Sequence, residues 1–281
     1  MVENRPWLTA FTHLALIIGI IIMFFPIYLA FVASTHTLAE IMSAPMPLLP
    51  GSHFVENYSR AFLEGSQSLG APVSVMMKNS LIMALGIALG KIAISLLAAF
   101  AIVYFQFRFR MFFFWTIFLT LMLPVEVRIL PTYKVVSDLG LLNSYTGLTL
   151  PLIASATATF LFRQFFMAVP DELAEAARVD GAGPLRFFID ILVPMSRTSI
   201  AAMFVILFIY GWNQYLWPLL ITTEERYYTL LIGINRMLAV GDQQAEWHII
   251  MATTLLAMTP PVLVVVFMQR LFVRGMTETE K

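Results

Sequence analysis

Long apolar runs, separated by shorter polar stretches, dominate the pattern of side chains along this chain. Six of these runs reach the roughly 20 residues that an α-helix needs to cross the hydrocarbon core of a bilayer. They cover residues 11–33, 79–107, 111–130, 139–162, 198–223 and 247–269. The pattern therefore predicts an all-α integral membrane protein with six transmembrane helices.

The segments between the runs organise the chain. Residues 34–78 mix prolines, glycines and acids, so we expect an extramembrane loop there, with a short helix around residues 57–62. Residues 224–246 form a second polar loop. The resulting domains are a first helix with its outer loop (1–75), a five-helix core (76–275) and a terminal tail (276–281).

The most polar interval between two apolar runs is the segment 170–194, PDELAEAARVDGAGPLRFFIDILVP. Asp171 and Glu172 place acids in a first helical turn, where the helix dipole favours them, and Gly181 is placed to end that helix. A second helix is expected over Pro184–Pro194, where the proline at its far end interrupts it. The pattern predicts two short helices joined by a glycine turn, between the fourth and fifth spans.

The first of these two short helices has the composition of a docking surface. Ala174, Ala176 and Ala177 leave a flat surface that a partner can approach closely, while Glu175 and Arg178 offer charge. A plainer interpretation is an ordinary amphipathic loop in which Glu175 and Arg178 form a weak pair at i,i+3. Both interpretations place the helix outside the membrane.

Composition supports the membrane assignment. With 59% hydrophobic residues, 12% charged residues and a mean hydropathy of +0.82, the chain of 281 residues has too little polar surface to cover a water-soluble globule. The net charge is zero, so no basic excess points to nucleic acid. The absence of cysteine excludes disulfides and thiolate chemistry, and the four histidines are scattered singly, so no metal site is expected.

Lys91 is the one charge within the second apolar run and falls near its middle. A lysine at that depth is costly unless it faces protein or water. Three interpretations stay open: an inward structural contact, snorkelling toward the interface, or a cation on the path of a solute.

Two charged residues at the end of the third run are candidates for a translocation path. Glu126 and Arg128 lie between two prolines near a membrane interface. They either anchor the helix end among lipid headgroups or face a solute at the outer mouth of a pore.

The fifth run carries further candidates for the translocation path. Asn213 and Gln214 lie deep in its length, where a lipid-facing helix would not carry amides, so at least one of them should face protein or a cavity. Trp212, Tyr215 and Trp217 fit either the lining of the path or an interfacial aromatic belt.

Basic residues set the orientation of the chain, because they are enriched on the cytoplasmic side of membrane proteins. If both termini are cytoplasmic, the outer side holds the smaller group, which is Arg60, Lys78, Arg128, Lys134, Arg226 and Arg236. The cytoplasmic side then holds Arg5, Arg108, Arg110, Arg163, Arg178, Arg186, Arg197, Arg270, Arg274 and Lys281. This asymmetry predicts cytoplasmic termini and places the 170–194 segment in the cytoplasm, where ATP is.

The 170–194 segment also carries a spaced motif. Glu175-Ala176-Ala177, then Gly181, and then Ile191-Leu192-Val193-Pro194 resemble the EAA signature of permease subunits in binding-protein-dependent ABC importers. Val193 stands where that family usually has leucine. In the family this segment is the cytoplasmic coupling helix, which sits in a cleft of the ATP-hydrolysing subunit. The coupling residues that the resemblance implies are Glu175, Ala176, Ala177, Arg178, Asp180 and Gly181.

The resemblance covers nearly the whole chain and looks like the sugar-uptake branch of ABC importer permeases, which includes the maltose permeases. Four segments are similar to the permease subunits of glycerol-3-phosphate importers. They are ENRPW at 3–7, MLPVEVRI at 122–129, SATATFLFRQFFM at 155–167 and FIYGWNQYLWPLL at 208–220.

The resemblance implies a type I ABC importer permease fold in a bacterial inner membrane. It also implies a heterodimer with a second homologous permease, two copies of an ABC ATPase and a periplasmic solute-binding protein. This chain has no GxxxxGK[ST] phosphate loop, so we expect no enzyme activity and no cofactor of its own, with ATP and Mg bound by the ATPase. The implied solute is sn-glycerol-3-phosphate; glycerophosphodiesters and other sugars or polyols stay open.

Two other classes of protein are weighed from the residues alone. A secondary transporter would show inverted repeats with helices broken at the midplane, for which Pro26 and Pro260 are weak candidates. An intramembrane enzyme would need a catalytic pair within its spans, and the sequence offers none.

Overall fold

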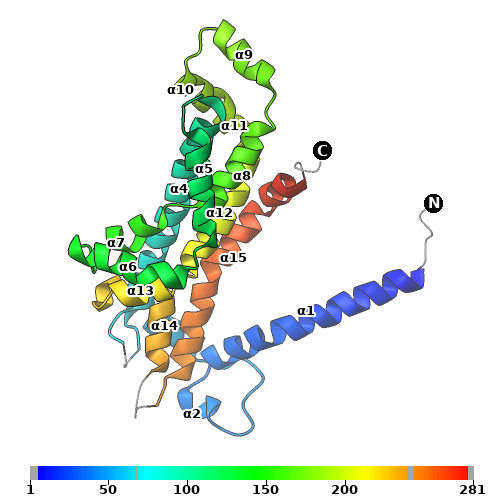
Figure 1. Ribbon diagram of the computed structural model, residues 1–281. Helices are drawn as coiled ribbons and strands as arrows, with labels where there is room; N and C mark the ends of the chain where they lie inside the picture. The colour runs from blue at the N-terminus through cyan, green and yellow to red at the C-terminus, as the bar shows by residue number, and fades with distance from the viewer. Residues whose placement is uncertain (1–5, 67–68, 240–243, 278–281) are drawn as a thin grey trace. The chain divides into compact units, whose positions relative to one another are not determined.

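The structure is a computed structural model that describes residues 6–66, 69–239 and 244–277. Every regular element within these residues is helical (Figure 1), and a single bridge pairs Ser66 with Leu69. The chain folds as two compact units. The first unit comprises Met1–Ser74 with Gly233–Met258, and the second comprises Val75–Ile232 with Thr259–Lys281.

The first unit begins with one long apolar helix. Its elements are α1 (Pro6–Ser34), α2 (Leu38–Ile41), α3 (Phe54–Leu63), most of α14 (Leu230–Leu238) and the start of α15 (Trp247–Thr277). The α3 helix confirms the short helix predicted in the first loop.

The second unit holds the remaining helices. They are α4 (Val73–Tyr104), α5 (Arg110–Leu119), α6 (Val125–Asp138), α7 (Tyr145–Thr149), α8 (Ala156–Met167), α9 (Asp171–Val179), α10 (Pro184–Phe187), α11 (Val193–Met195), α12 (Arg197–Trp212), α13 (Leu216–Ile221) and the end of α15.

The described helices account for six candidate spans by length and composition. Three are long single helices: Trp7–Ser34, Val73–Tyr104 and Trp247–Gln269. The other three are bent pairs, Arg110–Met122 with Val127–Asp138, Tyr145–Leu152 with Ala156–Met167, and Pro184–Met195 with Arg197–Trp212. The predicted all-α membrane protein is confirmed, and its described helices reach the predicted six spans when each bent pair is counted as one span.

The third span bends at a proline. Pro124 lacks an N–H group and holds the preceding Leu123 in an extended conformation with ψ 111°. The helix therefore ends at Met122, and α6 leaves at an angle of 108°. The prediction of one continuous helix over residues 111–130 is wrong for this reason.

The fourth span bends by 50° between Leu152 and Ala156. Ser155 caps the new helix, because its hydroxyl accepts a hydrogen bond from the Ala158 N–H at 3.2 Å. The predicted continuous helix over 139–162 is therefore two helices.

Pro194 does not end the second helix of the 170–194 segment, contrary to the prediction. The chain makes a π-helical turn over Phe188–Leu192, in which the Val193 N–H donates to the Phe188 carbonyl five residues earlier. This wider turn gives the proline ring room, and the helical path continues to Met195. The bend of 73° comes next, before Arg197.

The core of the second unit gathers around the middle of α4. Seven buried side chains from four helices form it: Met83 and Ile87 of α4, Ile129 and Val136 of α6, Leu148 of α7, and Trp217 and Ile221 of α13. The Trp217 indole N–H donates to the Gly147 carbonyl at 3.1 Å, so the largest side chain of the core is also satisfied as a donor.

The first unit fastens the end of α1 to the loop that follows it. The buried Asn57 amide of α3 donates to the carbonyls of Ser34 and His36, both at 2.9 Å. Thr37 and Glu40 form a capping box at α2. The Thr37 backbone N–H, with smaller contributions from the side chains of His36 and Thr37, lowers the pKa of Glu40 to about 2. This cap is therefore complete at neutral pH and is lost only as the pH falls from about 4.5 toward 2.

The contact between α4 and α12 gives the first prediction. A Cβ at Gly211 would lie 2.9 Å from the Ala84 Cα, so these helices touch through backbone. Gly211→Val should force them apart, at about 1–3 kcal/mol, and lower the melting temperature of the detergent-purified protein by several degrees. Gly19→Val is the matched control, because nothing lies within 4 Å of its Cβ position. Equal melting temperatures for the two variants would contradict this packing.

Candidate functional site

The α9 helix and its glycine turn form the most sharply defined polar feature of the second unit. Acids in the first turn and Arg178 in the last turn complement the helix dipole. At its end the Ala182 N–H donates to the Ala177 carbonyl at 2.8 Å and the Gly181 N–H donates to Arg178 at 3.0 Å. Together with the φ of +72° at Gly181, these bonds make a Schellman motif. The predicted helix and glycine stop are confirmed.

The alanines of α9 divide between two faces. Ala177 is buried and Ala174 is half-buried, and both line a cavity of about 240 Å³ with Tyr104 of α4 and Phe187 of α10. Ala176 is exposed on the other face. The flat alanine surface predicted for a partner is therefore largely occupied by the chain itself, which seats α9 on the end of α4.

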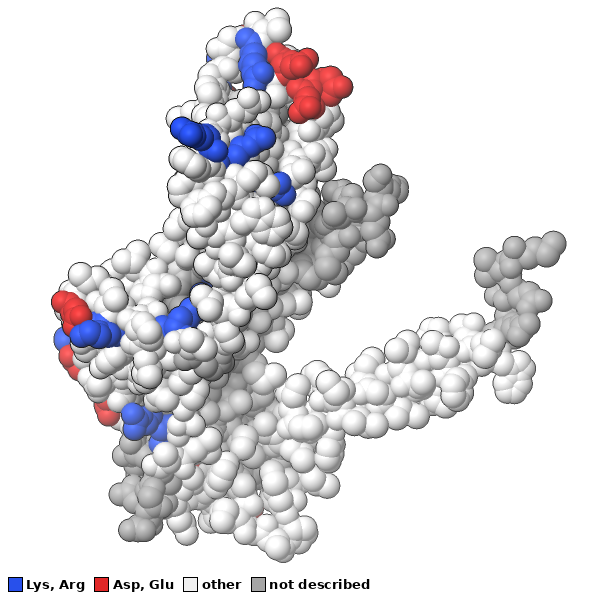
Figure 2. Space-filling view, in the orientation of Figure 1, with Lys and Arg blue, Asp and Glu red and all other residues white. Residues whose placement is uncertain are grey.

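The outward face of α9 is acidic with one apolar residue. Glu172, Glu175 and Ala176 are exposed, and Val179 is 88% exposed. Acidic side chains gather at the end of the second unit where α9 lies, with basic side chains beside them (Figure 2). Among the described residues no ion pair joins Glu175 to Arg178, whereas Arg186 of α10 pairs with Asp190 at 3.3 Å. The side chains of Glu175 and Val179 are therefore accessible on this face.

The fifth span breaks where the sequence analysis placed two amides inside a helix. The α12 helix ends at Trp212 and α13 begins at Leu216, because Pro218 cannot donate to the Gln214 carbonyl. Asn213 is exposed, and Gln214 is half-buried with its amide donating to the Tyr210 carbonyl at 3.2 Å. The predicted continuous helix over 198–223 is wrong, and both amides lie in or at the edge of an unwound segment.

The aromatic residues around this break pack inward. Trp212 is 5% exposed and stacks on Phe208, with ring centroids 5.9 Å apart. Trp217 belongs to the core of the second unit. The interpretation of these two tryptophans as a lipid-facing belt is therefore wrong, and Trp212 presents little surface to a solute within this chain.

Three charged candidates have different surroundings. Lys91 is buried, and its ammonium lies 3.8 Å from the centroid of the Tyr210 ring, which favours an inward contact over snorkelling. Arg128 is exposed on α6. The side chain of Glu126 lies outside the described part of the structure.

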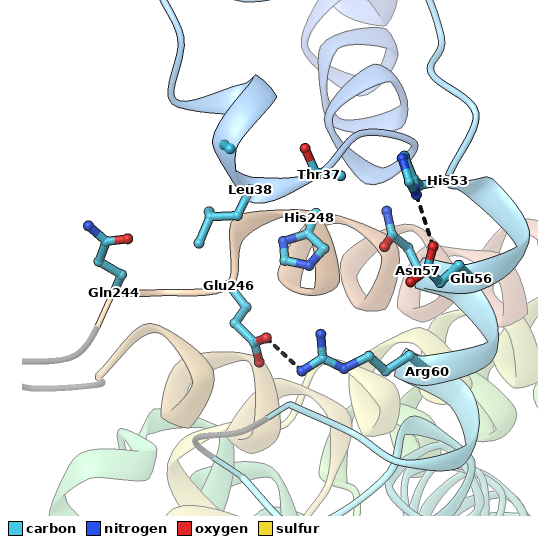
Figure 3. A pocket seen from close by; sticks show the side chains of 10 residues that line it. Thr37, Leu38, His53, Glu56, Asn57, Arg60, Gln244, Glu246 and His248 are labelled. Carbon is cyan, nitrogen blue, oxygen red and sulfur yellow. Dashed lines mark hydrogen bonds and ion pairs between the residues drawn. The ribbon is translucent and has the colours of Figure 1, made fainter.

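A polar cavity of about 890 Å³ in the first unit was not anticipated from the sequence. Figure 3 shows its lining from the loop after α1, from α3 and from the start of α15. Arg60 pairs with Glu246 across it at 2.7 Å, and His248 is buried beside them. Residues 186 positions apart meet here, so no local pattern could have indicated the cavity.

Comparison with known proteins identifies the class to which this geometry belongs. Residues 91–278 match the family described as binding-protein-dependent transport system inner membrane component. This chain belongs to that family. It is therefore a multi-pass transport permease of the inner membrane, with the helical permease fold that the sequence predicted.

Relatives of this permease are similar over their full length. The chain is 59% identical to the sn-glycerol-3-phosphate transport system permease protein UgpE of Agrobacterium fabrum, with 100% of each chain covered. Identity is 58% to the proteins of the same name from Escherichia coli O1:K1 and Brucella melitensis, again with 100% of each chain covered.

A solved structure supports the fold of this permease. The chain resembles a bacterial ABC transporter involved in the import of the acidic polysaccharide alginate, with a TM-score of 0.82 and 19% identity. The match covers 96% of this chain and 98% of the other.

The unwound segment gives the second prediction. Because Asn213 is exposed and Gln214 is partly covered, Asn213→Cys should react faster than Gln214→Cys with a water-soluble thiol reagent. The chain has no native cysteine to confuse the labelling. Ser95→Cys, fully buried in α4, is the unreactive control.

Labelling of the reconstituted transporter should be followed with and without ATP. If Asn213→Cys stays unlabelled in both conditions, the assignment of this segment to the translocation path fails.

Proposed function

We propose that this permease forms half of the translocation pore of an ATP-driven bacterial importer for sn-glycerol-3-phosphate. The assignment of the solute rests on the identity of 58–59%, over full length, to relatives named as permeases of sn-glycerol-3-phosphate transport systems. The chain itself catalyses no reaction; it contributes a path across the membrane and a contact for the subunit that hydrolyses ATP.

The partners follow from this assignment. A second homologous permease completes the pore, two copies of an ABC ATPase bind ATP and Mg on the cytoplasmic side, and a periplasmic binding protein delivers the solute. The α9 helix supports such an assembly, because it presents an exposed face without internal ion pairs and is anchored by its buried alanines. Val179 supplies the apolar contact of this face, and Glu175 and Asp180 supply its charge.

The orientation has both termini in the cytoplasm. The end of α4 lines one cavity with α9 and α10, so the turn that follows α4 lies at the same end of the second unit as the coupling loop. Basic residues gather on these segments: Arg108, Arg110, Arg178 and Arg186. This clustering of basic residues supports a cytoplasmic location for that end.

Reconstitution tests the proposed function. Proteoliposomes that contain both permeases and the ATPase should take up radiolabelled sn-glycerol-3-phosphate when the binding protein is outside and ATP is inside. Uptake should stop without the binding protein and without hydrolysable ATP. A complete complex that hydrolyses ATP in response to a loaded binding protein, but imports no phosphate ester, would refute the proposed solute.

The glycine turn gives a further prediction. A side chain at Gly181 meets nothing within 4 Å, so substitution there acts through the φ of +72° alone. Gly181→Val should disfavour the turn by about 1–2 kcal/mol and weaken ATPase binding roughly five- to thirtyfold. Gly181→Asn should retain binding, because asparagine tolerates the left-handed conformation.

Gly183→Ala is the matched control for the glycine turn, because Gly183 is equally open but has an ordinary φ of −71°. Binding should be measured as the amount of ATPase that co-purifies with correctly inserted permease. Native ATPase stoichiometry and uptake in Gly181→Val would show that coupling does not depend on this turn.

A further inference from the structure

Lys91 is a buried cation that neither the fold nor the coupling loop uses. It lies near the middle of α4, within a candidate membrane span, and is 7% exposed. Ionisable residues at such depth are costly and usually mark the path of an ion or a polar solute. The surroundings of this lysine therefore need a functional explanation.

The contact that holds Lys91 does not neutralise it. Its ammonium lies over the face of the Tyr210 ring at 3.8 Å from the centroid. A ring face attracts a cation through its quadrupole and carries no net charge. Among the described side chains no carboxylate forms an ion pair with Lys91, so a full positive charge remains inside the second unit.

A second cation, Arg128, lies on a helix that packs in the same core cluster as α4. Ile129 packs in one cluster with Ile87 of α4, and Lys91 follows Ile87 by about one helical turn on the same face. Arg128 precedes Ile129, so it lies on the helix whose Ile129 packs in the same cluster as Ile87 of α4. Two cations on helices that share a core cluster favour an anion near them.

Neutral hydrogen-bonding groups lie within about one turn of Tyr210, the residue that contacts Lys91. The Tyr210 carbonyl accepts a hydrogen bond from the Gln214 side-chain amide, and Asn213 is exposed where the fifth span unwinds. Irregular backbone at membrane depth is tolerated where it is buried in protein or lines a wet cavity. The arrangement therefore combines positive charge with neutral amides, which suits a solute that has one anionic group and several hydroxyls.

We propose that Lys91 binds the phosphate group of a phosphate monoester during its passage, and that Arg128 draws the anion toward it. Between passages the Tyr210 ring holds the ammonium, and the phosphate replaces the ring as its partner. The amides of the unwound segment bind the hydroxyls of the solute. This inference rests on the proposed function, since it names the group that recognises the anionic end of the proposed solute.

Charge substitution in the reconstituted importer tests this role. Lys91→Met keeps the apolar stem and removes the charge, so it should lower the uptake of sn-glycerol-3-phosphate about ten- to hundredfold, the range expected for loss of a hydrogen bond to a charged group. Lys91→Arg keeps the charge and should lose less uptake than Lys91→Met. Lys134→Met is the matched control, because Lys134 is exposed and pairs with Asp138.

Chemical restoration of the charge separates recognition from packing. Lys91→Cys should transport poorly and recover after reaction with 2-aminoethyl methanethiosulfonate, which adds an ammonium, but not after reaction with the neutral methyl reagent. The chain has no cysteine of its own, and the native complex treated in the same way controls for reaction at partner subunits. Tyr210→Leu removes the ring but leaves the charge, so it should transport better than Lys91→Met.

The outcomes that overturn the inference are distinct from failure of the proposed function. If the native complex imports the phosphate ester and Lys91→Met does so equally well, Lys91 does not bind the solute. Equal losses in Lys91→Met and Tyr210→Leu would assign the pair to packing between α4 and α12. A native complex that imports no phosphate ester would instead refute the proposed solute.

Discussion

The dominant constraint on this structure is that a bilayer supplies no water to backbone groups, so every break in a spanning helix must be satisfied by the protein itself. The chain meets this requirement with several local devices at breaks and helix ends. The Ser155 hydroxyl caps α8, and a π-helical turn before Val193 makes room for the ring of Pro194 so that the helical path continues. At the end of α13 the Asn143 side chain accepts from the N–H groups of Thr223 and Glu224.

These local devices explain which parts of the fold the sequence could predict. Apolar length, the acids of α9 and the glycine at its end are local signals, so six spans and the helix–turn–helix loop follow from them. Other helix ends depend on partners far along the chain. Asn143, for example, reaches a helix end about 80 positions away, and nothing in either segment alone indicates that pairing.

The candidate site was predictable to a similar extent. The spacing from Glu175 to Gly181 predicted the helix and glycine turn of the proposed coupling loop, but the direction of each alanine required the packing of α9 on α4. Asn213 and Gln214 were correctly singled out as unusual, although the reason is an unwound segment and not a wet helix face. The cavity around Arg60 and Glu246 could not be predicted from the sequence, because only the tertiary structure brings its lining residues together.

Aromatic packing joins the coupling loop to the membrane part of the second unit. Phe100 and Tyr104 of α4 contact Phe188 and Phe187 at centroid distances of 4.9 Å and 5.2 Å. Ala177 completes this contact from α9. Such dense interiors resist compression, so a displacement of the loop is transmitted to α4.

The continuity of α4 gives this contact a mechanical meaning. The helix runs from Val73 to Tyr104 without a proline or a break, so we expect it to move as a rigid body. Lys91 and Tyr104 both lie on this helix, about 20 Å apart along its axis at a rise of about 1.5 Å per residue. A push or twist at the Tyr104 end of α4 is therefore transmitted along the helix to Lys91.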